Sequence, residues 1–464
     1  MKITKLLLVM ALAGSSLNQA SAQNASSAPA ARHVGDGVRS IGDSDRYVAM
    51  PEDNRPKAFK PKASLVSNSQ MLDMEMLAPS ASGDCGSGSG ICNSGSCGSG
   101  CGSSGLVSGC GNKSTEYWMN MESLLWFGQR RHSPTLITTA NQGVLPVAGD
   151  PGVTGQFGGP DGTPTGLLTG YSLSGGKYLD SCQKIAVGGR VFGVFQNSQT
   201  RTVTSDGTTS VGIPFYNTGI NAEDAYLVAF NTGALPVSAG TVTARTDLNM
   251  IGAEASGYFL LGRSSDHRVD LVSGYTYNKL KDSTTLVSST TDQFTGNLIP
   301  DGTVFQTNDL FETANNFHGA HIGMLSSVIH KRVTLSTLAK VSFGSMNQTA
   351  SVRGFTTQDF NGTATFPGGI LTQQSNITEF SRNTFAFLPE MRVKMGYSVS
   401  ECIQLTVGYS FMYWSSVALS GNQIDHTVDF SQALGGAAST RPAFSFADSG
   451  YWMHGVDLGL SMNY

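Results

Sequence analysis

Adjacent carboxylate and imidazole side chains at Asp425-His426 form the pair in this sequence best suited to activating a water molecule. A carboxylate can orient an imidazole, and the imidazole can then take a proton from water. A hydrolytic site needs further groups that bind and polarise a substrate, and no second acidic pair accompanies this one. We therefore interpret Asp425 and His426 as solvated loop residues, expect no enzyme, and keep a hydrolase as a remote alternative.

Two other motifs that could bind a ligand or a metal do not have the residue spacing that such a site requires. The segment Gly170 to Lys177 resembles a phosphate-binding loop, but its glycine spacing is one residue too long and Tyr178 replaces the required Ser or Thr. His318 and His321 lie three positions apart on a predicted strand, so they face opposite sides and do not chelate one metal easily. We expect no cofactor and no metal site.

Charged side chains on the small or polar faces of alternating segments are the remaining candidates. In a sheet closed on itself such residues point into a lumen, where unpaired charges are costly. We therefore favour a set of mutually paired charges that plugs the lumen, and the functional alternative is a narrow pore lined by the same charges. The candidates are Glu122, Arg190, Glu254, Lys340, Glu390, Arg392 and Lys394.

Alternation of period two predicts the strands that carry these residues. In the last run, Val456, Leu458, Leu460, Met462 and Tyr464 share one face, with small or polar residues on the other. This suits a strand between lipid and a wet lumen. Ten such segments are predicted: Tyr117–Phe127, Lys184–Phe195, Gln199–Thr204, Thr241–Leu261, Arg268–Leu280, Asn315–Val328, Val333–Met346, Thr384–Val399, Cys402–Trp414 and Val456–Tyr464.

Composition supports a membrane barrel over a soluble domain. Charged residues are 13% of the chain, against about 25% in soluble domains. No segment after the N-terminus stays apolar for the roughly 18 residues of a membrane helix, whereas barrel strands alternate and escape that test. The net charge of -4 implies no nucleic-acid partner.

The connections between the predicted strands alternate between long and short, with five long loops and four short turns. This is typical of an up-and-down antiparallel transmembrane β-barrel, here of about ten strands, in which the last strand closes against the first. Ten strands lie near the size that side chains fill, whereas twelve to fourteen, the alternative count, would favour a pore. The loops Ser283–Thr307 and Asn347–Gln374 are long enough to contact a ligand or a neighbouring cell.

The N-terminal quarter lacks periodicity. Residues 1–22 have the pattern of a signal peptide, with Lys2 and Lys5 before an apolar segment and Ala20-Ser21-Ala22 as the cleavage site. Residues 23–113 are predicted to be a disordered periplasmic tether, and residues 114–464 the outer-membrane barrel. The tether carries a Gly/Ser/Cys-rich tract whose cysteines could form disulfides within or between chains. These are Cys85, Cys92, Cys97, Cys101 and Cys110.

A set of short motifs in fixed order resembles the outer-membrane barrel family called β-barrel porin family 7, whose function is unknown. The resemblance covers about residues 114–464 and implies the same barrel fold. The motifs are Tyr117-Trp118, Glu122–Trp126, Ser133–Thr138, Gly188–Arg190, Asn315–Gly319, Phe387–Glu390, Val407–Ser415, Gly421–Asp425 and Gly455–Gly459.

These observations predict a bacterial outer-membrane protein with its tether in the periplasm and its long loops outside. The expected role is a narrow pore or a structural envelope component, and the alternative is a surface adhesin or receptor that acts through its loops. Expected partners are outer-membrane lipid, the barrel-assembly machinery, for which Tyr464 is a candidate signal, and other envelope proteins through disulfides. Solute, ligand, disulfide pairing and oligomeric state do not follow from the sequence.

Overall fold

The described part of the chain is almost entirely β-structure. A computed structural model describes residues 116–294, 299–432 and 439–464, so the predicted signal peptide, the tether and its five cysteines lie outside it. The elements are β1 (Tyr117–Gly128), β2 (Arg131–Asn141), β3 (Thr154–Thr163), β4 (Leu167–Tyr178), β5 (Ile185–Ser205), β6 (Thr209–Asn217), β7 (Ala222–Asn231), β8 (Pro236–Arg263), β9 (His267–Asp292), β10 (Val304–His330), β11 (Val333–Asp359), β12 (Thr363–Pro367), β13 (Thr378–Ser398), β14 (Ile403–Val417), the short 3-10 helix η1 (Ser420–Gln423), β15 (Thr427–Val428) and β16 (Ser449–Asn463).

A search of the described residues finds no helix long and apolar enough to cross a membrane.

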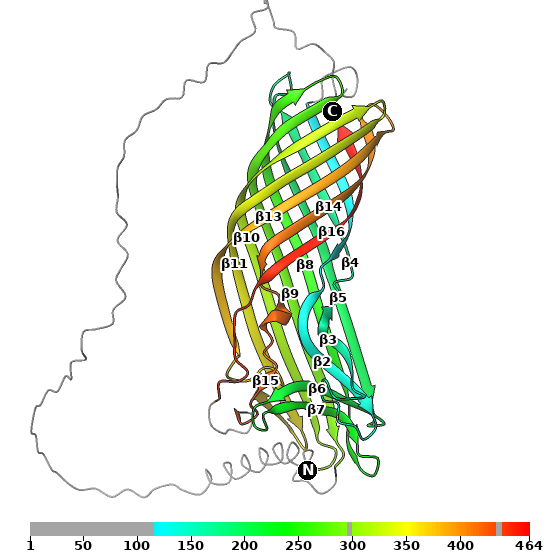
Figure 1. Cartoon of the computed structure of the whole chain (residues 1–464), viewed down its shortest axis with the longest axis vertical. Helices are drawn as coiled ribbons and strands as arrows, with labels where there is room; N and C mark the ends of the chain where they lie inside the picture. The colour runs from blue at the N-terminus through cyan, green and yellow to red at the C-terminus, as the bar shows by residue number, and fades with distance from the viewer. Residues whose placement is uncertain (1–115, 295–298, 433–438) are drawn as a thin grey trace, which may run out of the picture. The chain divides into compact units, whose positions relative to one another are not determined.

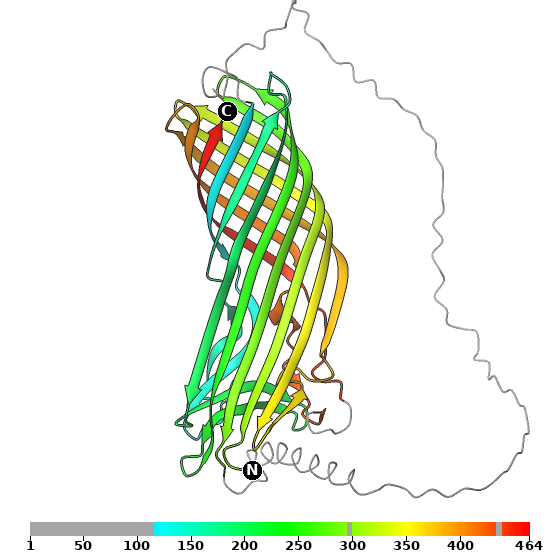
Figure 2. The ribbon, with the colours of Figure 1, turned by 180° about the vertical axis from the view of Figure 1, so that it is seen from behind.

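Ten of the strands close into a ring whose neighbouring pairs are all antiparallel (Figures 1 and 2). The ring runs β1, β16, β14, β13, β11, β10, β9, β8, β5 and β4, and β4 pairs with β1 again. Trp118 of β1 lies opposite Asn463 on one side and Gly176 on the other. The predicted all-β barrel of ten strands, closed between its first and last strand, is confirmed.

One of the ten predicted strands is nevertheless wrong, and one strand of the ring was not predicted. The segment Gln199–Thr204 is no separate strand, because β5 runs through the predicted turn with only a shift of register between Val194 and Asn197. In its place the ring contains β4, which lies in the long loop predicted between Phe127 and Lys184. Because one predicted strand is absent and one observed strand was not predicted, the predicted count of ten is still correct.

Long and short connections alternate around the ring, as predicted. The short turns, residues 179–184, 264–266, 331–332 and 399–402, lie at one end of the barrel, which we call the short-turn end. The long connections, residues 129–166, 206–235, 293–303, 360–377 and 418–448, lie at the other, the long-loop end. The short-turn end is at the top of Figure 1.

Four ring strands are much longer than predicted: β8 has 28 residues, β9 26, and β10 and β11 27 each. Most of the predicted loops 283–307 and 347–374 is therefore strand, paired across β9, β10 and β11. Their alternation was hidden because both faces carry Thr, Ser and Asn there, so polarity gave no period of two. Figure 2 shows these strands as one tall wall.

Large apolar side chains cover the outer surface next to the short-turn end. On β1 the exposed ones run from Tyr117 to Phe127. That advance corresponds to about 33 Å of strand and, at a tilt near 40°, about 25 Å of height, which matches the apolar band of outer-membrane barrels. Beyond this band the outward side chains become polar, for example Arg245, Asp247 and Asn249 on β8. The barrel therefore spans the membrane with its short-turn half and extends past it.

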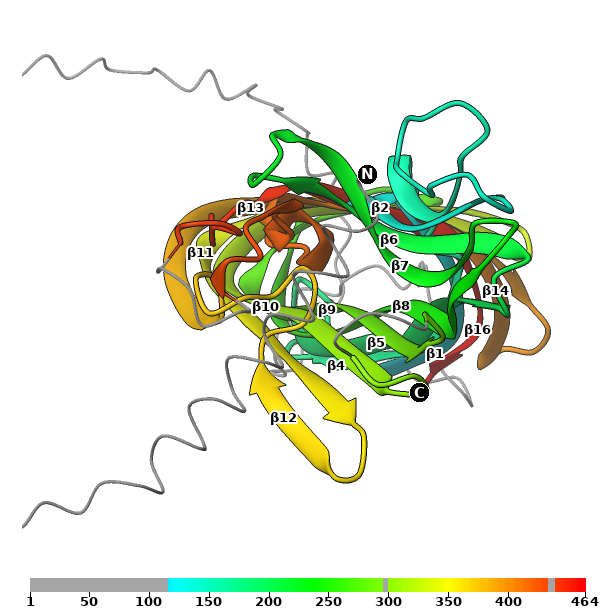
Figure 3. The same ribbon diagram turned by 90° about the horizontal axis from the view of Figure 1, so that it is seen from below.

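The strands β2, β3, β6 and β7 form a second layer at the long-loop end, which we call the loop sheet. It joins the ring through β7 and β8 in the order β3, β2, β6, β7, β8, and Figure 3 shows β6 and β7 lying across this end. Its apolar side chains, among them Ile137, Ile213 and Phe215, pack with inward residues of β8 to β11 such as Leu286 and Phe311. This apolar core fills the inside of the extension and excludes water from it.

Candidate functional site

All seven predicted lumen charges are inward-facing and largely buried, and register brings them to one level of the barrel. Arg190 of β5 lies directly opposite Glu254 of β8, and Lys340 of β11 lies opposite Glu390 of β13. Five of the seven, Glu122, Arg190, Glu254, Lys340 and Glu390, are less than a tenth exposed. Together the seven form what we call the charge layer.

Ion pairs cross the lumen within this layer. Arg190 Nη1 lies 2.7 Å from Glu390 Oε1 and 3.9 Å from Glu254 Oε1. Lys340 Nζ lies 2.5 Å from Glu254 and 3.1 Å from Glu390. Arg392 Nε lies 2.9 Å from Glu390, and Lys394 pairs with Glu122. Glu390 therefore stands among three cations and is the centre of the layer.

Pairing within the charge layer leaves some hydrogen-bonding capacity unused. Arg190 Nη2 and Arg392 Nε have no hydrogen-bond partner among the described residues, and neither has the acceptor Glu254 Oε1. For Arg392 the geometry to Glu390 is that of an ion pair without a hydrogen bond. Buried polar atoms of this kind call for an explanation, and a bound group that satisfies them is one.

Asp457 and His321 are among the polar groups of the lumen that sequence reasoning overlooked. Asp457 of β16 accepts a hydrogen bond from Trp126 Nε1 at 2.8 Å and another from Ser410. His321 is buried, with Nε2 3.0 Å from Ser256 Oγ and Nδ1 2.8 Å from Thr276 Oγ1. Both lie on the inward face of an alternating run, so that face alone could have identified them. His318 lies on the opposite face, beside Tyr275.

An apolar layer closes the lumen between the charge layer and the long-loop end. It is one cluster of 18 buried residues, and every strand of the ring contributes at least one of them. Trp126, Phe192, Phe317, Trp414 and Tyr451 are its largest side chains, and none is more than 3% exposed. These side chains form an apolar level across the inside of the barrel.

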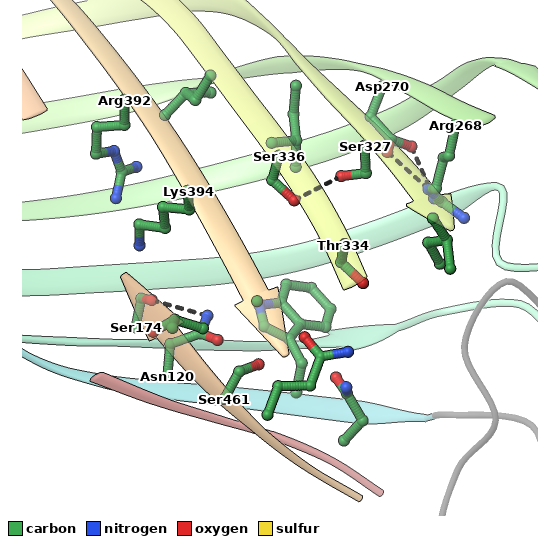
Figure 4. A pocket seen from close by; sticks show the side chains of 18 of the residues that line it. Asn120, Ser174, Arg268, Asp270, Ser327, Thr334, Ser336, Arg392, Lys394 and Ser461 are labelled. Atoms are coloured by element: carbon green, nitrogen blue, oxygen red, sulfur yellow. Dashed lines mark hydrogen bonds and ion pairs between the residues drawn. The ribbon is translucent and has the colours of Figure 1, made fainter. Parts of the chain in front are cut away.

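A cavity of about 690 Å³ lies on the other side of the charge layer, toward the short-turn end (Figure 4). Arg392 and Lys394 reach into it from β13, and Lys331 and Arg332 line it from the β10–β11 turn. Opposite them stand the rings of Trp118, Tyr178 and Tyr258. Hydroxyl and amide groups complete the wall, including Asn120, Ser174, Ser327, Ser336 and Ser461.

Glycines of β4 and β5 make room for one of these rings. A Cβ on Gly176 would lie 2.2 Å from Trp118 Cζ2, and a Cβ on Gly188 would lie 3.0 Å from the same atom. The indole therefore rests on bare backbone, 5.1 Å from the Tyr178 ring and 5.7 Å from the Tyr258 ring between centroids. Gly176 of β4 and Gly188 of β5 thus make room for the aromatic wall of the cavity.

The candidate hydrolytic pair does not form a catalytic arrangement. Asp425 Oδ2 accepts hydrogen bonds from Ala443 N and Arg441 Nη1, each at 2.8 Å, and Oδ1 accepts one from Thr427 N at 2.9 Å. Burial alone would raise the pKa of Asp425, but these donors outweigh it and lower the pKa. His426 Nε2 instead lies 3.8 Å from Glu223. Asp425 is a loop anchor with both oxygens occupied.

The remaining predicted residues lie near the short-turn end or outside the described chain. Tyr464 closes β16 onto β1 through backbone hydrogen bonds to Glu116 and Tyr117. Cys182 and Cys402, in two short turns, are both disulfide-bonded. Within the described residues no three His, Cys, Asp or Glu side chains are grouped to hold a metal ion.

Comparison with known proteins identifies the family. A family model described as "Putative beta barrel porin-7" matches residues 118–464. The chain belongs to this family. The family resemblance inferred from the ordered motifs is thereby confirmed, and the family match covers the whole ring, the charge layer and the cavity described above. A search of curated proteins finds no match.

Solved structures similar to this family member are outer-membrane barrels at low identity. The outer membrane protease OmpT from Escherichia coli is 9% identical, with a TM-score of 0.34, over 75% of this chain and 97% of that one. The Pseudomonas putida toluene transporter TodX is 8% identical, with a TM-score of 0.17, over 77% and 93%. At these values neither likeness carries an argument about function.

Proposed function

We propose that this protein is a closed outer-membrane barrel that acts as a structural component of the bacterial envelope. The observation that carries the proposal is the apolar layer, to which all ten ring strands contribute. An open channel of this family would need a polar path through that level, since ions are excluded from apolar packing. The paired charge layer next to it supports the same role.

The proposed orientation follows from the shape of the barrel. Outer-membrane barrels have short turns on the periplasmic side and long loops outside. We therefore place the short-turn end and the cavity in the periplasm and the loop sheet outside the cell. The proposed partners are outer-membrane lipid around the apolar band, the barrel-assembly machinery, and envelope proteins linked through disulfides of the tether.

Conductance of the full-length protein in planar lipid bilayers tests closure. We expect no stepwise currents from the wild type, after insertion is verified by heat-modifiable migration on gels. The variant Arg392→Ala/Lys394→Ala should stay closed as well, because the apolar layer remains. Stable currents from the wild type, changed in ion selectivity by this variant, would establish the narrow pore instead.

A surface receptor is the second candidate, favoured by the β11–β12 hairpin. Its tip carries the exposed ring of Phe360, with Phe355 exposed nearby, and Figure 3 shows the hairpin projecting away from the ring. Replacing residues 360–367 by a short turn leaves the paired part of β11 with β10 and β13 intact. A receptor should then lose cell or ligand binding while the barrel still inserts, and unchanged binding would exclude this role for the hairpin.

A further inference from the structure

The cavity at the short-turn end combines cationic donors, hydroxyl and amide groups and aromatic rings, and this combination specifies a ligand class. We propose that it binds a carboxylated sugar of one or two rings. The proposal does not depend on whether the barrel conducts, because the cavity lies on the short-turn side of the charge layer.

The floor of the cavity supplies the contacts for a carboxylate. Arg392 and Lys394 project into the cavity side by side (Figure 4). Part of each side chain stays accessible, 13% for Arg392 and 20% for Lys394. A guanidinium is suited to hold a carboxylate, often through two hydrogen bonds. A ligand carboxylate in the cavity can therefore contact both cations.

The wall of the cavity is suited to a sugar ring. Trp118, Tyr178 and Tyr258 form a contiguous aromatic surface, on which the apolar face of a pyranose can pack. Ser327 of β10 and Ser336 of β11 line the facing wall, and their hydroxyls lie 3.1 Å apart. Asn120 donates to Ser174 at 3.2 Å on β1 and β4, the strands that carry Trp118 and Tyr178. These are the exchangeable polar groups that hydrogen-bond sugar hydroxyls.

Charge and volume agree with this ligand class. Six cationic and four carboxylate side chains line the cavity, so it has an excess of positive charge. Its volume of about 690 Å³ falls within the range of roughly 300 to 1,000 Å³ for small-molecule sites. The rim cations Lys331 and Arg332 make no ion pair within the described residues, which leaves them available to attract an anion.

Saturation-transfer NMR on the full-length protein in detergent micelles tests the proposal, with D-glucuronate as the probe and D-glucose as its neutral counterpart. We expect glucuronate to bind at least tenfold more tightly than glucose. Arg392→Gln should weaken glucuronate binding at least tenfold. Ser336→Phe, which keeps the charges but fills the cavity, should abolish it.

The control is Arg353→Gln, which removes an exposed arginine of β11 outside the cavity lining and should leave binding unchanged. Heat-modifiable migration confirms that each variant is folded, and Ser336→Phe tests the site without touching the charge layer. The proposal is overturned by any of three results: no transfer to glucuronate, equal binding of glucose, or binding retained in both cavity variants.

Discussion

At the scale of single residues, Glu390 sets the charge balance of the lumen. Its carboxylate lies within 3.1 Å of Arg190, Lys340 and Arg392, and the residue is only 5% exposed. Three cations that converge on one buried carboxylate repel each other once its charge is removed. Lys340 and Arg190 also reach Glu254, so the loss would extend through the layer.

We predict that Glu390→Gln destabilises the folded barrel by roughly 3 to 5 kcal/mol, the usual cost of removing one partner of a buried ion pair. Urea unfolding in micelles, followed by tryptophan fluorescence, measures this. Glu379→Gln on the same strand is the matched control, because its side chain is 69% exposed and exposed pairs contribute about 0 to 1 kcal/mol. Equal effects of the two substitutions would contradict a central role for Glu390.

Asp425 gives a pH-dependent prediction at the same scale. Its pKa is lowered in the folded protein, so its ionised form stabilises the loop above the unfolded pKa, and this contribution is lost as the pH falls through the folded pKa. Asp425→Asn should therefore destabilise the loop at neutral pH, by about 1 kcal/mol for a partly exposed hydrogen-bonded carboxylate.

Hydrogen exchange of the Thr427 and Ala443 amides, which donate to Asp425, measures this difference. The difference in exchange rate between wild type and variant should have its full size at pH 5 to 7. It should decrease below about pH 3.9, the ordinary pKa of an aspartate. A difference between wild type and variant that stays constant down to pH 2 would show that the carboxylate charge is not the cause.

At the scale of elements, the length of β10 and β11 determines what is exposed at the long-loop end. Residues that look like loop in sequence are held by ladders on both sides: Leu310 pairs with Arg353 on β11 and with Thr285 on β9. Backbone hydrogen bonding within the sheet protects a strand from proteases even where its side chains are exposed. The truly irregular tip is the turn after β11, residues 360–362.

Chymotrypsin should therefore cleave the folded protein after Phe360 and leave Phe355 intact. The two rings have nearly equal exposure, 43% and 45%, so side-chain access does not distinguish them, whereas Phe355 is paired with both Asn308 and Pro367. Mass spectrometry of the early fragments identifies the site. Cleavage at Phe355 at a comparable rate would mean that this part of β11 is not a stable strand.

Pro389 shows how one residue limits an element. The ladder between β13 and β14 ends at Glu390 opposite Met412, because the next residue along, Pro389, has no backbone N–H to donate. Beyond it, toward the long-loop end, β13 and β14 are joined by the hydrogen bond from Phe387 N to Ser415 Oγ and by the contact of the Phe387 and Tyr413 rings. The ion pair of Arg382 with Asp448 at 2.8 Å bridges this part of β13 to the last long connection.

At the scale of the whole described molecule, the barrel holds two large apolar clusters on shared strands. The apolar layer lies in the membrane-spanning half, and the core of the loop sheet lies in the extension. The strands β1 and β16 contribute only to the first, whereas β2 and β6 contribute only to the second. Damage to the second core should therefore spare the strands that lie wholly within the first.

Phe215→Ala tests this division. Phe215 is fully buried in the core of the loop sheet, and its truncation should cost about 3 to 5 kcal/mol locally. Hydrogen exchange should accelerate in β2 and β6 but change little in β1 and β16. Phe355→Ala, which truncates an exposed ring, is the control. Uniform acceleration across all strands would show that the two clusters unfold as one unit.

The sequence by itself determined the barrel, the number of its strands, nine of the ten strands, the alternation of long and short connections and the seven inward charges. The physical reason is that lipid demands an apolar outer face, so in the membrane-spanning half each strand alternates between an apolar and a polar side chain, as from Ile403 to Phe411. In this half of the barrel the alternation can be read from a few neighbouring residues. Glu122 and Arg190 could therefore be assigned to the inner face from the residues next to them in the sequence.

Only the tertiary structure decided what lies beyond the membrane and what fills the lumen. Outside lipid both faces of β9 and β10 are polar, and the period of two disappears although the ladder continues. The glycines of β4 serve the Trp118 ring of another strand, and the apolar layer gathers one or a few side chains from each of ten strands. Such contacts join residues far apart in the chain, so no local pattern records them.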